Sequence, residues 1–157
     1  KRGDKMKALV LSDSHRYFGG IARAMENESD IDLIIHAGDV QQDVDDIMAA
    51  WSNIPCAYVI GNNDYFVHDV PDKRIFSFDG KRIFLTHGHL FGVKLSLNRL
   101  ILAAKEANAD ICIFGHTHTS YLEETEDMLI LNPGSCFRSY AVLEINDGRV
   151  RAEIKKI

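Results

Sequence analysis

Two histidines lie one residue apart in the stretch IFGHTHTSY, residues 113–121, directly after an apolar run. His116 and His118 follow Gly115, and glycine lets the backbone turn sharply and approach a ligand closely. Imidazole is a good ligand for transition metals. A pair of histidines at the end of an apolar run therefore predicts a metal site, provided that other segments supply the remaining ligands.

Four other apolar runs also end in polar residues. These ends are Ser12-Asp13-Ser14-His15, Gly38-Asp39, Gly61-Asn62-Asn63-Asp64 and His87-Gly88-His89. Ligands of open α/β sheets bind beyond the carboxyl ends of strands, so we expect these side chains to converge at one edge. The set contains no cysteine, which argues against a closed structural zinc site. It exceeds the needs of one four-coordinate ion and suits two ions that share a bridging carboxylate.

The elements that must position these residues alternate between strand and helix in the first part of the chain. Strands are expected at 7–12, 32–37 and 56–60, and helices at 19–28 and 45–51. Such alternation predicts parallel β-α-β units.

Antiparallel pairing is expected later in the chain. Asp79-Gly80 and Asn146-Asp147-Gly148 are hairpin signals. They separate strands 74–78 and 82–86, and strands 139–145 and 150–156; a helix at 95–108 and strands at 110–114 and 128–132 complete the pattern. The fold class is therefore α/β (α+β), with two mixed sheets packed face to face and helices outside. We expect a single domain over residues 6–157, and we treat residues 1–5, which precede Met6, as a remnant outside that domain.

Composition narrows the class of protein. The 157 residues are 46% hydrophobic and 26% charged, and the net charge is −5. No apolar run approaches the roughly 18 residues of a membrane span, and Lys and Arg form no basic stripe, so neither a membrane partner nor extended nucleic acid is expected. The three cysteines are scattered, which favours reduced thiols in the cytoplasm.

Each motif also has a simpler explanation. Asp13 alone could cap a helix, and Asn62-Asn63 could form only a left-handed turn. We interpret the remaining polar residues as structural: His36 as a hydrogen-bonded core residue, His68 as solvated, and Asp43, Asp45 and Asp46 as acids at a helix start.

The blocks D-S-H (13–15), G-D (38–39), G-N-N-D (61–64), H-G-H (87–89) and G-H-T-H (115–118), in this order, resemble the calcineurin-like metallophosphoesterases. The chain is most similar to the small single-domain bacterial and archaeal phosphodiesterases of that family, and N-P-G-S (132–135) is similar to their late loop. The resemblance implies a β-sandwich flanked by helices. It also implies in-line attack of a metal-bridging hydroxide on a small phosphodiester substrate.

The resemblance further implies a ligand set for two divalent metal ions. Asp13, His15 and His118 would hold the first metal; Asn62, His87 and His116 would hold the second; Asp39 would bridge them. Manganese is the first choice by similarity to the family, and Ni, Zn, Fe, Co or Mg are alternatives because these ligands accept several ions.

Asn63 departs from the family pattern, in which many members have a histidine that assists the leaving group and is oriented by the counterpart of Asp64. Asparagine cannot act as a general acid near neutral pH, so we expect a preference for diesters or good leaving groups. His89 could replace the missing proton donor or contact phosphate, or it could only make a supporting hydrogen bond. Arg16 could reach the phosphate or remain solvated.

Two other functions are weighed against the phosphodiesterase. A catalytically weak protein-binding scaffold of the same fold, as a retromer subunit is, could lose metal ligands without penalty, whereas here all seven positions hold suitable ligands. A nuclease would need a long cationic surface that this acidic chain does not provide. Exposed apolar loop residues such as Phe66 and Phe91 would allow a homo-oligomer.

Overall fold

The computed structural model describes residues 5–157. The prediction for residues 1–5 therefore falls, apart from Lys5, outside the described residues, and Lys5 begins strand β1. None of the helices among residues 5–157 is both long and apolar enough to cross a membrane.

The first sheet has the strand order β10-β9-β1-β2-β3. Its strands are β1 (Lys5–Leu11), β2 (Leu33–His36), β3 (Cys56–Tyr58), β9 (Ser139–Asn146) and β10 (Arg149–Lys156). Strands β1, β2 and β3 are parallel, and β9 pairs antiparallel with both β1 and β10. The parallel half carries the predicted D-S-H, G-D and G-N-N-D segments just beyond its carboxyl ends.

The second sheet has the strand order β4-β5-β6-β8-β7. Its strands are β4 (Lys73–Phe78), β5 (Lys81–Thr86), β6 (Ile111–Ile113), β7 (Tyr121–Glu124) and β8 (Leu129–Asn132). Strands β5, β6 and β8 are parallel, whereas β4 and β7 pair antiparallel at the two edges. The H-G-H and G-H-T-H segments follow β5 and β6.

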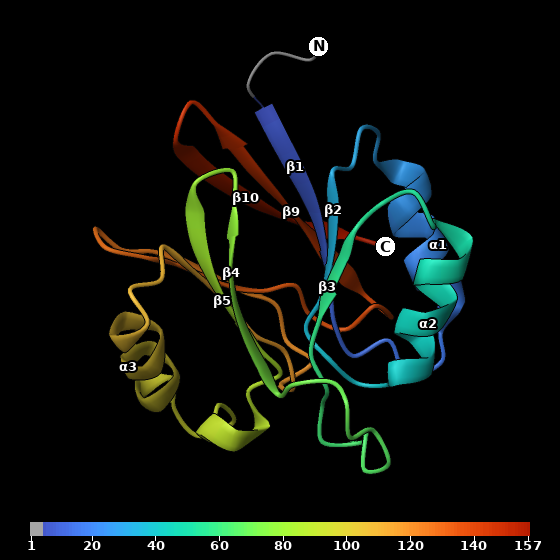
Figure 1. Ribbon diagram of the computed structural model, residues 1–157, viewed down its shortest axis with the longest axis horizontal. Coiled ribbons are helices and arrows are strands. Elements are labelled where there is room, and N and C mark those ends of the chain that lie inside the picture. The colour runs from blue at the N-terminus through green and yellow to red at the C-terminus, as the bar shows by residue number, and fades with distance from the viewer. Residues whose placement is uncertain (1–4) are drawn as a thin grey trace.

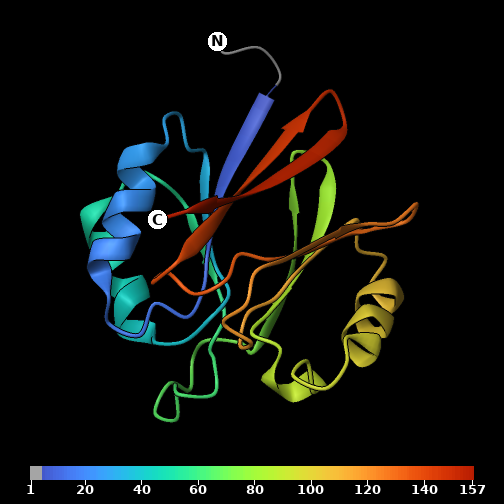
Figure 2. The ribbon, with the colours of Figure 1, turned by 180° about the vertical axis from the view of Figure 1, so that it is seen from behind.

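The two sheets pack face to face between two layers of helices (Figure 1), and the view from behind shows the same order (Figure 2). Helices α1 (Phe18–Asn27) and α2 (Gln41–Ala50) cover the first sheet, and α3 (Asn98–Glu106) covers the second. The apolar core between the sheets includes Val10, Ile35 and Ile113. The central strands are buried on both faces, which explains their continuous apolar runs. The predicted fold class is confirmed.

Some element boundaries differ from the predictions. Helix α2 begins four residues before the expected 45, and α3 is shorter than the expected 95–108. The backbone N–H of Gln41 donates to Asp64 Oδ1 at 2.7 Å, so a residue that is distant in sequence satisfies the first turn of α2. Strand β7 and the short 3-10 helix η1 (His89–Phe91) were not predicted.

Candidate metal centre

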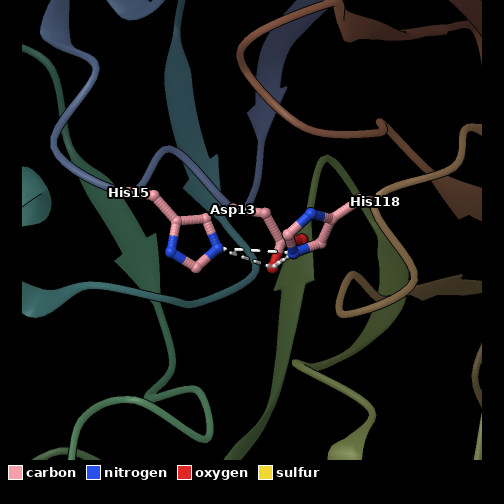
Figure 3. A group of neighbouring side chains, drawn as sticks. All are labelled: Asp13, His15 and His118. Carbon is pink, nitrogen blue, oxygen red and sulfur yellow. Dashed lines mark hydrogen bonds and ion pairs between the residues drawn. The ribbon is translucent and has the colours of Figure 1, made fainter.

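Two groups of potential metal ligands meet at the carboxyl edge of the two sheets, and they share Asp13. The first consists of Asp13, His15 and His118, and the second of Asp13, Asp39 and His87. Figure 3 shows the side chains of Asp13, His15 and His118 converging on one point. His118 lies in the loop after β6, so the first group joins one sheet to the other.

The distances within the groups are short for side chains that come from separate loops. Nε2 of His118 lies 3.3 Å from Asp13 Oδ1 and 3.3 Å from Nε2 of His15. Nε2 of His87 lies 3.6 Å from both Asp13 Oδ1 and Asp39 Oδ2. Nε2 of His15 lies 3.9 Å from Asp39 Oδ2, so Asp39 is within reach of both groups.

The Asp13 carboxylate has one oxygen that is fully bonded and one that is not. Oδ2 accepts hydrogen bonds from Ser12 Oγ at 2.7 Å and from the backbone N–H of His116 at 3.0 Å. Oδ1 is buried without a hydrogen-bond partner among the described residues. A buried carboxylate oxygen left unpaired is costly unless a cation compensates it, so this atom fits a metal ligand.

His87 is held in the tautomer that a metal site needs. Its fully buried ring donates a hydrogen bond from Nδ1 to the carbonyl oxygen of Ala37 at 2.8 Å, so Nε2 is the ring atom that the neutral imidazole offers to a metal. Nε2 then faces Asn62 Oδ1 at 3.0 Å. An imidazole nitrogen and an amide oxygen that face one point can both bind a cation. The donor set therefore fits a divalent ion at this position as well.

His116 and His89 lie beside His87, with ring centroids 5.1 Å and 5.5 Å from it. Burial and the neighbouring charges of His87 and Lys94 lower the pKa of His116 to about 4, so its imidazole is neutral and available to a metal near pH 7. Burial also lowers the pKa of His89, and the neighbouring His87 lowers this pKa further. Nδ1 of His89 is buried and has no partner within residues 5–157.

The predicted catalytic residues Asn63 and Asp64 have different neighbours. Asn63 contacts Asp39 through both its backbone N–H and its side-chain amide. Asp64 is buried, and its carboxylate accepts the backbone N–H groups of Gly61 and Gln41, both at 2.7 Å. Its two hydrogen bonds therefore fix the G-N-N-D turn and the start of α2, and they do not involve the Asn63 side chain.

Arg16 lies against α2. Its Nη1 is 3.3 Å from Asp43 Oδ1 and 3.1 Å from Asp46 Oδ2. Asp43 also accepts a hydrogen bond from Ser14 Oγ at 2.6 Å, and Ser14 Oγ lies 3.0 Å from Nε2 of His36. Asp43 lies in the first turn of α2, as predicted, and also anchors the loop that carries the first ligands, whereas Asp45 and Asp46 lie further along the helix than the prediction placed them.

His36 is the hydrogen-bonded core histidine that its apolar surroundings indicated. Its Nδ1 accepts the backbone N–H of Gly38 at 3.2 Å, which leaves Nε2 to donate to Ser14. Burial lowers the pKa of His36 to about 4 despite the nearby Asp13 and Asp43 carboxylates. His68 is exposed, as expected.

The N-P-G-S segment supports the site from behind. Asn132 donates from Nδ2 to the carbonyl of Gly115 at 3.2 Å, and Ser135 Oγ donates to the carbonyl of Asp13 at 2.9 Å. Gly115 itself has no room for a side chain, because a Cβ there would lie 2.0 Å from Ser12 Oγ. These contacts link the loops after β1, β6 and β8.

Several residues at the centre adopt left-handed backbone conformations that non-glycine residues rarely take. Positive φ angles occur at Asp13 (51°), His15 (41°), Arg16 (68°), Asp39 (25°), His116 (71°) and His118 (62°). Strained backbone of this kind concentrates at functional sites, where surrounding contacts enforce it.

Lys94 was missed in the sequence. It is exposed, yet its charge contributes to the lowered pKa of His116, which places a cation near the metal ligands. It follows η1 in a loop with no local pattern that would have pointed to the site.

Phe91 was expected to be exposed but packs against the α3 side of the core, with its ring 6.0 Å from that of Phe84. Phe66 is 92% exposed.

The fold and the ligand groups define a class of metal-binding phosphoesterases built on two sheets. Residues 6–148 match the model of the calcineurin-like phosphoesterase superfamily domain, and the chain belongs to this family. A phosphodiesterase of Methanocaldococcus jannaschii is 32% identical over 151 residues, which cover 83% of this chain and 84% of that protein.

Solved structures share the fold over nearly the whole chain. A conserved protein of Streptococcus pneumoniae, described as a predicted phosphoesterase, has a TM-score of 0.80 at 28% identity, and the match covers 97% of this chain and 90% of that one. Vacuolar protein sorting 29 of Cryptosporidium parvum has a TM-score of 0.76 at 17% identity, with 98% of each chain covered. The second likeness concerns the fold alone.

Proposed function

We propose that the chain is a phosphodiesterase that hydrolyses small phosphodiesters with the help of two divalent metal ions, manganese being the first candidate. The observation that carries the proposal is the pair of ligand groups that share Asp13, one of whose oxygens is buried and unpaired. Two ions bring about +4 against about −2 from the Asp13 and Asp39 carboxylates, and when bound they activate water and attract a phosphate.

The residues would divide the work by their positions. Asp13, His15 and His118 would hold one ion, and Asn62, His87 and His116 the other, with Asp39 between them. The Nδ1–H of His87 bonded to Ala37 would keep its Nε2 aimed at the centre. The loops that follow β1, β2 and β3 in the first sheet and β5 and β6 in the second would then contribute to one site.

His89 and Lys94 are the proposed contacts for the substrate's phosphate. His89 lies beside His87 and His116, and its Nδ1 has no partner among residues 5–157. Its lowered pKa leaves a neutral imidazole at pH 7, which can donate a hydrogen bond but is a poor general acid. A diester with a good leaving group needs little proton transfer, so this arrangement favours diesters over monoesters.

The proposal is tested by hydrolysis of bis-p-nitrophenyl phosphate with Mn²⁺, after chelation by EDTA and after restoration of the metal. We expect EDTA to abolish activity and Mn²⁺ to restore it. Asp39→Asn should lower kcat/KM by at least about 10²-fold, whereas Asp127→Asn, in an exposed turn, should not change it. Activity that survives complete chelation would reject the metal mechanism.

A protein-binding scaffold is the second candidate, and the likeness to vacuolar protein sorting 29 favours it at the level of the fold. A scaffold has no need for the unpaired Asp13 oxygen or for the fixed tautomer of His87. The scaffold would be favoured if the protein, shown by elemental analysis to contain metal, hydrolysed no diester with Mn, Ni, Zn, Fe, Co or Mg.

A further inference from the structure

A cavity opens beside the metal centre, and His118 forms part of its wall. Its volume is about 340 Å³, and its walls come from the loop after β6, the start of β9 and the end of β10. His118, Ser120, Arg138, Ile154, Lys155 and Lys156 are among its lining residues. None of the roles assigned above to the metal ligands uses this cavity, although one ligand forms part of its wall.

The cavity is cationic in a chain of net charge −5. Three basic side chains line it, and no acid does. Lys155 is already paired, because its Nζ lies 2.7 Å from Glu28 Oε1. Arg138 and Lys156 are exposed and make no ion pair with another residue of the described part of the chain. Two positive charges are therefore available to an anion that enters the cavity.

His118 is the residue that the cavity and the metal centre share. Its Nε2 is 3.3 Å from Asp13 Oδ1, so one side chain borders both the ligand groups and the cationic cavity. An ester group of a substrate bound at the centre could extend past His118 into the cavity. Ile154 offers it an apolar surface, and the planar guanidinium of Arg138 suits the oxygens of a phosphate.

We infer that this cavity selects phosphodiesters in which one ester group carries a second phosphate, held by Arg138 and Lys156. The inference rests on the proposed function, because it assumes that the reacting phosphate binds at the centre. It narrows the substrate class from any small diester to one with an additional anionic group on one of its ester groups.

The test compares two chromogenic diesters that differ by one phosphate, thymidine 5′-(p-nitrophenyl phosphate) and its 3′-phosphorylated form. We expect kcat/KM to be about 5- to 10-fold higher for the 3′-phosphorylated diester, since two exposed cations give only a screened attraction. The preference should disappear in Arg138→Gln and Lys156→Gln. Arg149→Gln, at the opposite end of β10, removes the same charge outside the cavity and should preserve it.

A binding measurement separates this inference from the proposed function. Calorimetry on the Mn²⁺-loaded protein should show tighter binding of thymidine 3′,5′-bisphosphate than of thymidine 5′-monophosphate, with a gap that narrows as salt rises. Equal binding of the two nucleotides, or equal loss in Arg149→Gln and Arg138→Gln, would overturn the inference. Selective binding without any hydrolysis would instead keep the cavity and reject the phosphodiesterase.

Discussion

Asn63 holds Asp39 through both of its nitrogen atoms. Its backbone N–H donates to Asp39 Oδ1 at 2.9 Å, and its side-chain Nδ2 donates to Oδ2 at 2.6 Å. Each carboxylate oxygen has two lone pairs, so Oδ2 can accept this hydrogen bond and still bind a cation. Asn63 therefore orients the carboxylate proposed to lie between the two ions, whatever it contributes to the substrate.

Replacement of Asn63 by a residue that can transfer a proton tests the expected preference for diesters. In Asn63→His, hydrolysis of phenyl phosphate, a monoester with a poor leaving group, should rise by about 10²-fold relative to that of bis-p-nitrophenyl phosphate. Both rates are measured with Mn²⁺. Asn53→His, in the exposed turn at the opposite end of β3, serves as the control. An unchanged ratio would show that proton donation at position 63 does not limit the monoester reaction.

Asp13→Asn should have opposite effects on the metal-free and metal-loaded protein. Without metal, the new amide can donate to Nε2 of His118 where Asp13 Oδ1 now has no hydrogen bond, so stability should rise by about 1 kcal/mol. Mn²⁺ should stabilise the wild type but should stabilise the variant much less, because the variant lacks one carboxylate ligand. Thermal unfolding at pH 8, with EDTA and with Mn²⁺, measures both effects.

The matched control for this comparison is Asp127→Asn, which makes the same chemical change in an exposed turn. It should leave both midpoints within experimental error. If Asp13→Asn destabilised the EDTA-treated protein instead, the buried Asp13 Oδ1 without a hydrogen bond would not be what lowers the stability of the metal-free wild type.

His36 should make the protein sensitive to mild acid. Its folded-state pKa of about 4 lies below the ordinary value of 6.5, so the unfolded chain binds the proton first. The stability it contributes is full above pH 6.5 and is lost as the pH falls towards 4. By pH 4.5 the loss should be roughly 2–3 kcal/mol. Urea unfolding of the EDTA-treated wild type and of His36→Gln, at pH 7.5 and at pH 4.5, measures how much of the pH-dependent stability comes from His36.

The exposed His68 provides the control, since His68→Gln should leave the pH dependence of the wild type unchanged. The cost of His36→Gln at pH 7.5 should be nearly absent at pH 4.5. A cost that is equal at both pH values would mean that His36 acts only through packing.

Gly115→Ala tests how closely the backbone must approach Asp13. The added methyl group would lie 2.0 Å from Ser12 Oγ and 2.8 Å from Asp13 Oδ2, so the loop must move. We expect a loss of about 1–3 kcal/mol in stability together with weaker Mn²⁺ binding. Gly19→Ala in α1 is the comparison, because its methyl group meets only the Tyr17 ring at 3.3 Å and alanine favours the helix. Titration calorimetry and thermal unfolding report the two quantities.

The architecture was predictable where local patterns carry it. Asp79-Gly80 and Asp147-Gly148 form the two hairpin turns that their residue types indicated. Apolar runs that end in polar residues identified the parallel strands, and the structure brings their ends to one edge. The start of α2 at Gln41 was not predictable locally, because its backbone N–H is satisfied by Asp64 from another segment.

The surroundings of the site were less accessible to sequence reasoning than its ligands. Asp43 was correctly placed near a helix start, but a charge pattern along one helix says nothing of Ser14 or Arg16, which bond to it from another loop. Lys94 is near His116 only because η1 folds the chain back. Such contacts depend on tertiary structure and leave no periodicity in the sequence.

The left-handed turns at His15, His116 and His118 have a consequence for how the protein discriminates between ions. Each such residue costs on the order of 1 kcal/mol or more, and the hydrogen bond from the His116 backbone N–H to Asp13 Oδ2 holds one of these turns in place before any ion arrives. Capture of an ion then requires little ordering of the chain. Preferred bond lengths and angles, rather than raw affinity, should then decide which cation is retained.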